Sequence, residues 1–268
     1  MNLFSEFGRR VPPPNMRLFS STPKSYYAFE KPHIDYQAIL DRAKQYNGVP
    51  INYTVQEFKE KSSKILRMLS RDKIYASILN GVHVPFACKL TSEIDDLGTH
   101  LQDVLLPKVS TAFLDGNQGG YFKAILQGDS QLKFNIELDP HSRFGEFVKA
   151  SRSDVVVGWL FPGVLQEYDV ESQRLQMQTL KESKGVNVCL SGGLDICSAM
   201  TGYPNLLISQ SKYSPILCLS AYVHRDPRLV CVMKSYGPHM EFWCMTQMLT
   251  KTIKQVSEQW AGGLTVYI

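Results

Sequence analysis

The residues whose types and order best fit a chemical role are Ser191-Gly192-Gly193-Leu194-Asp195, which directly follow the predicted strand 186–190. Two glycines between a strand and a helix let backbone N–H groups converge on one point, where the helix dipole favours negative charge. Ser191 and Asp195 would add a hydroxyl and a carboxylate beside that point. We therefore take Ser191, Gly192, Gly193 and Asp195 as a candidate anion-binding site.

This stretch resembles the SGGxDS phosphate-binding loop of the PP-loop ATP pyrophosphatases. The resemblance implies an enzyme that binds a nucleotide or phosphate. The chain departs from the family pattern at Ile196, where the family has serine. The alternative is a turn that only joins a strand to a helix. The chain after Asp195 favours this alternative, because it shows the pattern of a hairpin and one helix rather than of repeated βα units.

The cysteines and histidines show no motif of a metal or redox centre. No two of the six cysteines form a C-x-x-C pair, and no two of the six histidines form H-x-x-x-H. Most of the cysteines lie among apolar residues, which is typical of buried thiols in a reducing compartment. The sequence therefore predicts no metal site and no cofactor, identifies no catalytic residue, and leaves open whether the protein is an enzyme.

Residues 1–29 differ in composition from the rest of the chain. They are rich in arginine and serine, and no acidic residue lies between Glu6 and Glu30. Their first apolar residues would share one face of a helix: Leu3, Phe4, Phe7 and Val11. These features are typical of a mitochondrial presequence, and Arg17-Leu18-Phe19 before Ser20 resembles a matrix-processing site. We therefore predict a protein of the mitochondrial matrix. Glu6 and the proline run 12–14 favour the alternative, a flexible arm of a cytoplasmic protein.

The charge of the chain is distributed evenly after this segment. The net charge is +4, from 29 basic and 25 acidic residues, and three arginines lie within the first 19 residues. A nearly balanced body argues against strong non-specific binding of nucleic acid. RNA could stack on the aromatic and basic stretch formed by Tyr26, Tyr27, Phe29, Lys24 and Lys31, although packing of these rings on the fold is favoured. No apolar run is long enough to predict a transmembrane segment.

The elements that must position these residues follow from apolar spacing and from turn and cap residues. Helices are predicted over 33–47, over 54–70 with a capping box of Thr54 and Glu57, and over 92–107. A hairpin is predicted from 121–127 and 131–138, joined by Gly128-Asp129-Ser130. Further predicted helices cover 144–150, 171–183 and 240–260. Further predicted strands cover 154–161, 186–190, 205–209 and 264–268, and a second hairpin joins 215–223 to 229–235.

Together these elements predict an α+β fold in which N-terminal helices pack on a mostly antiparallel sheet and a long C-terminal helix covers the sheet. We expect a flexible segment 1–29 and one globular domain 30–268, helical over 33–106 and rich in strands over 120–268. The function we expect is that of a non-catalytic mitochondrial accessory, assembly or binding protein that docks to a larger protein complex. The alternative is a nucleotide- or phosphate-binding enzyme that uses residues 191–195.

Overall fold

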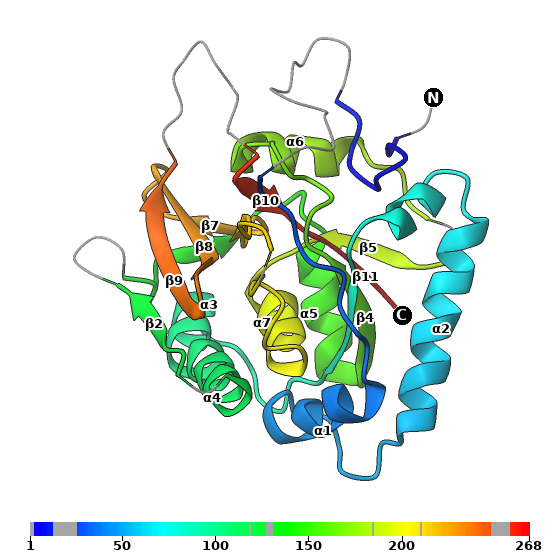
Figure 1. The fold of residues 1–268 in the computed structure, drawn as a ribbon, viewed down its shortest axis with the longest axis horizontal. Helices are drawn as coiled ribbons and strands as arrows, with labels where there is room; N and C mark the ends of the chain where they lie inside the picture. The colour runs from blue at the N-terminus through cyan, green and yellow to red at the C-terminus, as the bar shows by residue number, and fades with distance from the viewer. Residues whose placement is uncertain are drawn as a thin grey trace.

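The computed structural model describes residues 3–12, 26–117, 119–126, 131–183, 185–209, 211–247 and 258–268 (Figure 1). These residues form helices together with one antiparallel sheet of four strands, one mixed sheet of five strands and one pair of short strands. The predicted α+β class is confirmed. Within the described part of the chain, no helix combines the length and apolar character needed to cross a membrane.

The first helix begins three residues later than predicted, whereas the second begins at the capping box that the sequence predicts. Helix α1 (Tyr36–Tyr46) begins after Asp35, whose carboxylate accepts a hydrogen bond from the Gln37 N–H. Helix α2 (Val55–Arg71) has the full capping box: Glu57 N–H donates to Thr54 Oγ1 at 3.2 Å, and Thr54 N–H donates to Glu57 Oε2 at 2.7 Å. Such reciprocal bonds satisfy backbone donors that a helix N-terminus otherwise leaves free. A short 3₁₀ helix, η1 (Ala76–Asn80), follows.

The third predicted helix, expected over 92–107, begins only at Leu97 and does not end at Pro107. It runs through α3 (Leu97–His100), the π-helical turn η2 (Leu101–Leu105) and α4 (Leu106–Gly116). In the π turn, Leu106 N–H donates to the carbonyl of Leu101, five residues earlier. The wider turn interrupts the regular hydrogen-bond ladder immediately before Pro107, so the missing proline N–H no longer ends the helix.

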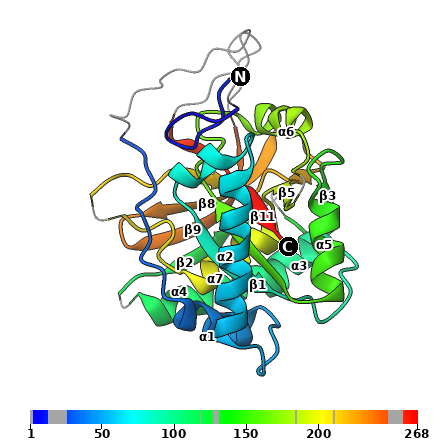
Figure 2. The same ribbon diagram turned by 90° about the vertical axis from the view of Figure 1, so that its right-hand side faces the viewer.

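The four-stranded sheet has the order β1-β4-β11-β5 and is antiparallel throughout. Its strands are β1 (Val84–Cys88), β4 (Val156–Phe161), β11 (Leu264–Tyr267) and β5 (Asn187–Leu190). The last strand of the chain thus lies in the middle of the sheet. Helix α2 packs along this sheet, where the Trp159 indole N–H of β4 donates to the Ser62 carbonyl at 3.0 Å (Figure 2).

The five-stranded sheet has the order β10-β6-β8-β9-β2. Its strands are β10 (Trp260–Gly262), β6 (Ile216–Cys218), β8 (Leu229–Tyr236), β9 (His239–Thr246) and β2 (Phe122–Ile125). The two short strands β3 (Ile136–Leu138) and β7 (Tyr222–His224) form a separate antiparallel pair.

Both hairpins expected from the sequence need correction. The first is wrong, because β2 pairs in parallel with β9 and β3 pairs with β7; the expected connection 128–130 lies outside the described residues. The second is partly right, because β6 does pair antiparallel with β8, but β7 leaves this sheet. The segment 205–209, expected as a strand, is a turn after a helix. Long-range partners, which sequence spacing does not reveal, decide these pairings.

The prediction of a long C-terminal helix over 240–260 is also wrong for the residues of this range that the structure describes. Residues 239–246 form β9, and 260–262 form β10, while 248–257 lie outside the described residues. Along β9, burial alternates with a period of two: Met240, Phe242 and Cys244 face the core. The residues between them lie on the outer face of the sheet, and this alternation is that of a strand.

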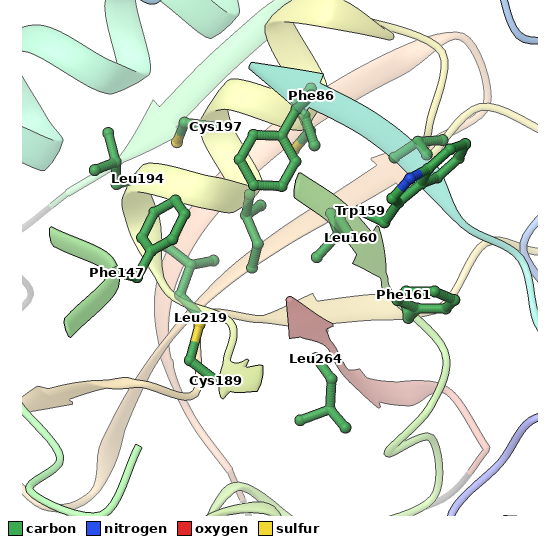
Figure 3. Packing of buried hydrophobic residues seen from close by; sticks show 14 of the residues in the cluster. Phe86, Phe147, Trp159, Leu160, Phe161, Cys189, Leu194, Cys197, Leu219 and Leu264 are labelled. Carbon is green, nitrogen blue, oxygen red and sulfur yellow. The ribbon is translucent and has the colours of Figure 1, made fainter. Parts of the chain in front are cut away.

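The centre of the core is helix α7 (Gly193–Gly202), in which every residue is buried. It packs against α1, α4 and β1 (Figure 1). Figure 3 shows Leu194 and Cys197 of α7 among aromatic side chains such as Phe86 and Phe147. Two further helices, α5 (Phe144–Ser153) and α6 (Val170–Thr179), complete the fold.

The N-terminal residues 3–12 pack on the fold without forming the helix that their apolar spacing suggests. Phe4 is 2% exposed, and its ring centroid lies 5.7 Å from that of Tyr75. Arg10 N–H donates to the Val164 carbonyl at 2.9 Å, and the Tyr168 hydroxyl donates to the Arg10 carbonyl at 3.1 Å. This segment therefore belongs to the fold. The suggested processing site at Arg17–Ser20 lies outside the described residues.

Replacing Phe4 with alanine should destabilise the protein strongly. Because the ring is buried, we expect Phe4→Ala to lower the free energy of unfolding by about 3–5 kcal/mol. The matched control is Phe7→Ala, since Phe7 is 48% exposed in the same segment; its effect should stay within about 0.5 kcal/mol. Urea denaturation measures both, and equal effects would show that residues 3–12 do not pack as described.

Candidate functional site

The stretch Ser191–Asp195 forms the strand-to-helix turn that its sequence predicts. Ser191 follows β5, Gly192 precedes the helix, and α7 begins at Gly193. Ser191 N–H donates to the Gly263 carbonyl at 3.0 Å, and Ala221 N–H donates to the Ser191 carbonyl at 2.9 Å. The turn is thus tied both to the start of β11 and to the segment before β7.

The carboxylate of Asp195 occupies the position beside the helix N-terminus that an anion would take. Asp195 is fully buried; Gly192 N–H donates to its Oδ1 at 2.9 Å, and the Thr265 hydroxyl donates to its Oδ2 at 2.5 Å. The Ser191 hydroxyl lies 3.0 Å from Thr265 Oγ1 and donates to it, since the Thr265 hydrogen is already engaged. The chain's own carboxylate therefore bonds to a backbone donor that a bound phosphate would use.

Burial dominates the protonation equilibrium of Asp195. It raises the pKa of this carboxyl from 3.8 to about 6, while the hydrogen bonds from Thr265 and from the N–H of Gly192 act in the opposite direction. At neutral pH the group is therefore mostly ionised, although no cationic side chain bonds to it among the described residues. The sequence located Asp195, but it contained no signal for Thr265, which lies far away in the chain.

Two aromatic rings fill the space over the glycines. A Cβ placed on Gly193 would lie 2.6 Å from Tyr222 Cε2, and one on Gly192 would lie 3.0 Å from Phe144 Cζ. Glycine is required at both positions because the rings approach the backbone so closely. An external anion would reach this turn only after Tyr222 and Phe144 had moved, and the anion-binding hypothesis stays a prediction.

The side chains near the turn are poorly suited to nucleophilic or metal chemistry. Burial raises the pKa of both Cys189 and Cys197, so these thiols stay protonated at neutral pH. Across the part of the chain that is described, no three His, Cys, Asp or Glu side chains come together as they would around a metal ion.

A second candidate site lies on the surface and consists of Tyr26, Tyr27 and Tyr213, which we call the tyrosine surface. Tyr27 forms a parallel bridge with Tyr213, and their ring centroids lie 5.7 Å apart. Tyr213 N–H donates to the Tyr26 carbonyl at 3.1 Å, and Ala28 N–H donates to the Tyr213 carbonyl at 3.0 Å. Tyr26 is nevertheless 74% exposed and Tyr213 is 68% exposed. The backbone thus holds two aromatic side chains in water.

The sequence singled out two of the three tyrosines of this surface. It identified Tyr26 and Tyr27 in the basic and aromatic stretch, but Tyr213 is distant in the chain and has no local signal. Phe29 of the same stretch packs on the fold as expected, since a Cβ on Gly163 would lie 3.3 Å from its ring. Lys24 lies outside the described residues.

Acidic side chains also lie at the tyrosine surface. Glu258 Oε1 accepts a hydrogen bond from Tyr26 N–H at 3.0 Å. Glu30 Oε1 accepts from the Ser209 hydroxyl at 2.7 Å and from Ser211 N–H at 3.2 Å, close to Tyr213 in the chain. The surface therefore combines exposed aromatic rings with two carboxylates and with the exposed Lys212, which directly precedes Tyr213.

The raised pKa of Asp195 predicts an unusual dependence of stability on pH. The folded state binds this proton more tightly than the unfolded state, so the stabilisation is present below about pH 4 and is lost as the pH rises toward 6. The difference in free energy of unfolding between wild type and Asp195→Asn should therefore change by roughly 2 kcal/mol between pH 4 and pH 7, because the wild type loses stability relative to the variant as the pH rises. Urea denaturation at several pH values measures this difference.

The control for this measurement is Asp226→Asn. The pKa of Asp226 is shifted in the opposite direction from that of Asp195, so its contribution to stability has the opposite dependence on pH. Hydrogen bonds from Arg228 lower the pKa of Asp226 to about 2, so its stabilisation is present above about pH 4 and is lost as the pH falls toward 2. Parallel stability curves for wild type and Asp195→Asn from pH 4 to pH 7 would contradict the burial of an ionisable carboxyl at the start of α7.

The geometry thus offers a buried turn capped by its own carboxylate and an exposed aromatic surface held by backbone hydrogen bonds. No protein-family model, no curated protein and no solved structure matches this chain.

Proposed function

We propose that this chain is a non-catalytic binding protein that docks on a larger protein assembly through the tyrosine surface. The observation that carries the proposal is the exposure of Tyr26 and Tyr213, at 74% and 68%, on backbone that is fixed by hydrogen bonds. Tyrosine is enriched at the energetically important centres of protein interfaces, because its ring contributes large apolar area and its hydroxyl a polar contact.

The fixed backbone favours binding in a second way. Association loses conformational entropy when side chains and loops become ordered at an interface. Here the chain around Tyr27 and Tyr213 is already ordered by its bridge, and Gln166 Nε2 donates to the Tyr27 carbonyl at 3.0 Å. Little further ordering of the backbone is needed when a partner covers the two exposed rings.

The chemistry of the turn Ser191–Asp195 supports the non-catalytic function over the enzymatic alternative. The groups that could act on a substrate already bond to one another: Asp195 accepts from Gly192 and Thr265, and Ser191 donates to Thr265. A catalytic group must come within hydrogen-bond reach of the substrate. In this fold Tyr222 and Phe144 separate the turn from any outside molecule.

A protein partner fits the tyrosine surface better than RNA does. Single-stranded nucleic acid is held by aromatic stacking together with a positively charged groove that follows the phosphates. At this surface Glu258 accepts from Tyr26 N–H, Glu30 accepts from Ser209 and Ser211, and the one exposed basic side chain next to a tyrosine in the described sequence around Tyr213 is Lys212. These carboxylates would repel phosphates, whereas a protein partner can supply donors or basic side chains to them.

Removing the exposed rings should release the partner without unfolding the chain. We expect the double variant Tyr26→Ala/Tyr213→Ala to shift the endogenous protein from a large assembly to the monomer position in native size-exclusion chromatography, with affinity reduced at least ~10-fold. The matched control is Tyr236→Ala, because Tyr236 is 76% exposed at the β8–β9 turn. A wild-type chain that migrates as a free monomer, or a control that loses the assembly equally, would contradict the proposal.

We place this binding protein in the mitochondrial matrix, a proposal supported by the composition of residues 1–29. N-terminal peptide mass spectrometry of the endogenous protein tests it, and the expected mature chain starts at Ser20 or Ser21. That chain lacks the contacts of Phe4 and Arg10, so a recombinant chain starting at Ser20 should unfold at lower urea concentration than the full chain. A mature protein that starts at Met1 or Asn2 and is recovered from cytosol would contradict the location.

A further inference from the structure

Two cysteines face each other across the β8–β9 hairpin. Cys231 of β8 and Cys244 of β9 are directly opposite in the register, at equal distances from the turn Gly237-Pro238. Both are free thiols, both are buried in the main core, and their sulfur atoms are within hydrogen-bond distance of each other. Their side chains therefore lie on the same face of the sheet and in contact.

The backbone hydrogen bonds show which kind of cross-strand pair this is. The Cys231 carbonyl accepts from Leu219 N–H at 2.9 Å, on the β6 side of β8. Met240 N–H donates to the Tyr121 carbonyl at 2.9 Å, on the β2 side of β9, and Cys244 has the same orientation because it lies four residues further along the strand. The pair is thus the non-hydrogen-bonded kind, whose Cα atoms typically lie about 4.5 Å apart. A separation of about 4.4–6.8 Å is the range found in disulfides.

We propose that Cys231 and Cys244 form a reversible dithiol–disulfide pair, which makes the β8–β9 hairpin a redox-sensitive modification site. The oxidant we assign is a hydroperoxide, the chemical class that oxidises thiolates directly. The geometry lets the disulfide form between facing strands that already hold the two sulfur atoms together.

The two thiols have different parts in this reaction. A hydrogen bond between the two thiols lowers the pKa of Cys244 and raises that of Cys231. Cys244 is also the more exposed of the two, at 6% against 3%. Because the thiolate is the nucleophile, Cys244 is the thiol that attacks the oxidant and Cys231 is the thiol that resolves the product.

The reaction balances in two steps. The Cys244 thiolate attacks one peroxide oxygen, the O–O bond breaks, and the other oxygen leaves as water or an alcohol after taking up the proton that Cys244 released. The Cys231 sulfur then attacks the sulfenic sulfur of Cys244, the S–O bond breaks, and the leaving hydroxide takes the proton of Cys231 to become water. Two electrons pass from the sulfurs to the peroxide, and a dithiol reductant reverses the change by exchange.

The other cysteines do not offer this arrangement. Cys218 lies opposite Val232 and belongs to the apolar cluster on the other face of the five-stranded sheet. Cys88 lies opposite Val156, and Cys189 lies opposite Thr265. In the described strands, no second pair of cysteines shares a register position.

The test uses the reduced full-length chain and hydrogen peroxide. After treatment under native conditions, free thiols are blocked with N-ethylmaleimide in denaturant, and intact mass and peptide mapping follow. We expect two of the six cysteines to lose their maleimide adducts, a linked Cys231–Cys244 peptide to appear, and dithiothreitol to restore all six adducts. Six adducts after peroxide, or a linked peptide that joins other cysteines, would overturn the proposal.

Two controls separate this pair from general oxidation. Cys244→Ser should abolish the linked peptide, whereas Cys218→Ser should leave it unchanged, because Cys218 lies on the opposite face. The wild-type chain oxidised in urea provides a control that needs no variant: linkage of Cys231 to Cys244 should dominate only in the folded chain. Equal yields of all cysteine pairs in folded and unfolded protein would show that the strand geometry does not direct the reaction.

Discussion

The hydrogen bond from Thr265 to Asp195 joins the last strand of the chain to the central helix, and the packing of the core depends on this junction. Helix α7 is buried along its whole length, so water cannot satisfy the N–H groups at its start. A partner for them must come from inside the protein. The Asp195 carboxylate accepts from one of these groups, the N–H of Gly192, and the hydroxyls of Thr265 and Ser191 offset part of the energetic cost of burying its charge.

The same region brings the two ends of the chain together. Residues 164–167, which follow β4, bond to both ends: Val164 accepts from Arg10 N–H, and Leu165 N–H donates to the carbonyl of Gly262, the last residue of β10. Glu167 pairs with Arg9 at 3.0 Å and adopts a positive φ of 76°, a strained conformation for a residue other than glycine. The contacts around Glu167 hold it there. The four-stranded sheet likewise pairs β4 and β5 with the last strand of the chain, so it is complete only when residues 264–267 are in place.

Local signals in the sequence were sufficient where an element depends on its own residues. The capping box of Thr54 and Glu57 located α2, and the apolar run of β4 located the strand buried on both faces. Local signals did not predict β9 as a strand, because its outer face also carries apolar residues. Trp243 and Met245 pack there on a second cluster with Val232. Because both faces of β9 carry apolar residues, the sequence does not show the alternation of apolar and polar residues that is typical of a strand. The spacing of its apolar residues is also compatible with a helix, which is what we predicted. The position of the Ser191–Asp195 turn could be predicted in the same local way, but Tyr222 and Thr265, which decide its chemistry, come from distant strands.

The distribution of polar and aromatic groups explains why we place function on the outside of this fold. Around α7 the polar side chains bond to one another, so their chemistry is used to hold the structure together. Tyr26 and Tyr213 differ, because their backbone is ordered while their rings remain in water. Burial of apolar surface contributes about 25 cal/mol per Å², so a fold that fixes these rings in the open leaves that free energy unused within the monomer. A partner that covers the rings of Tyr26 and Tyr213 would gain this free energy of burial, and the backbone beneath the rings would need no further ordering.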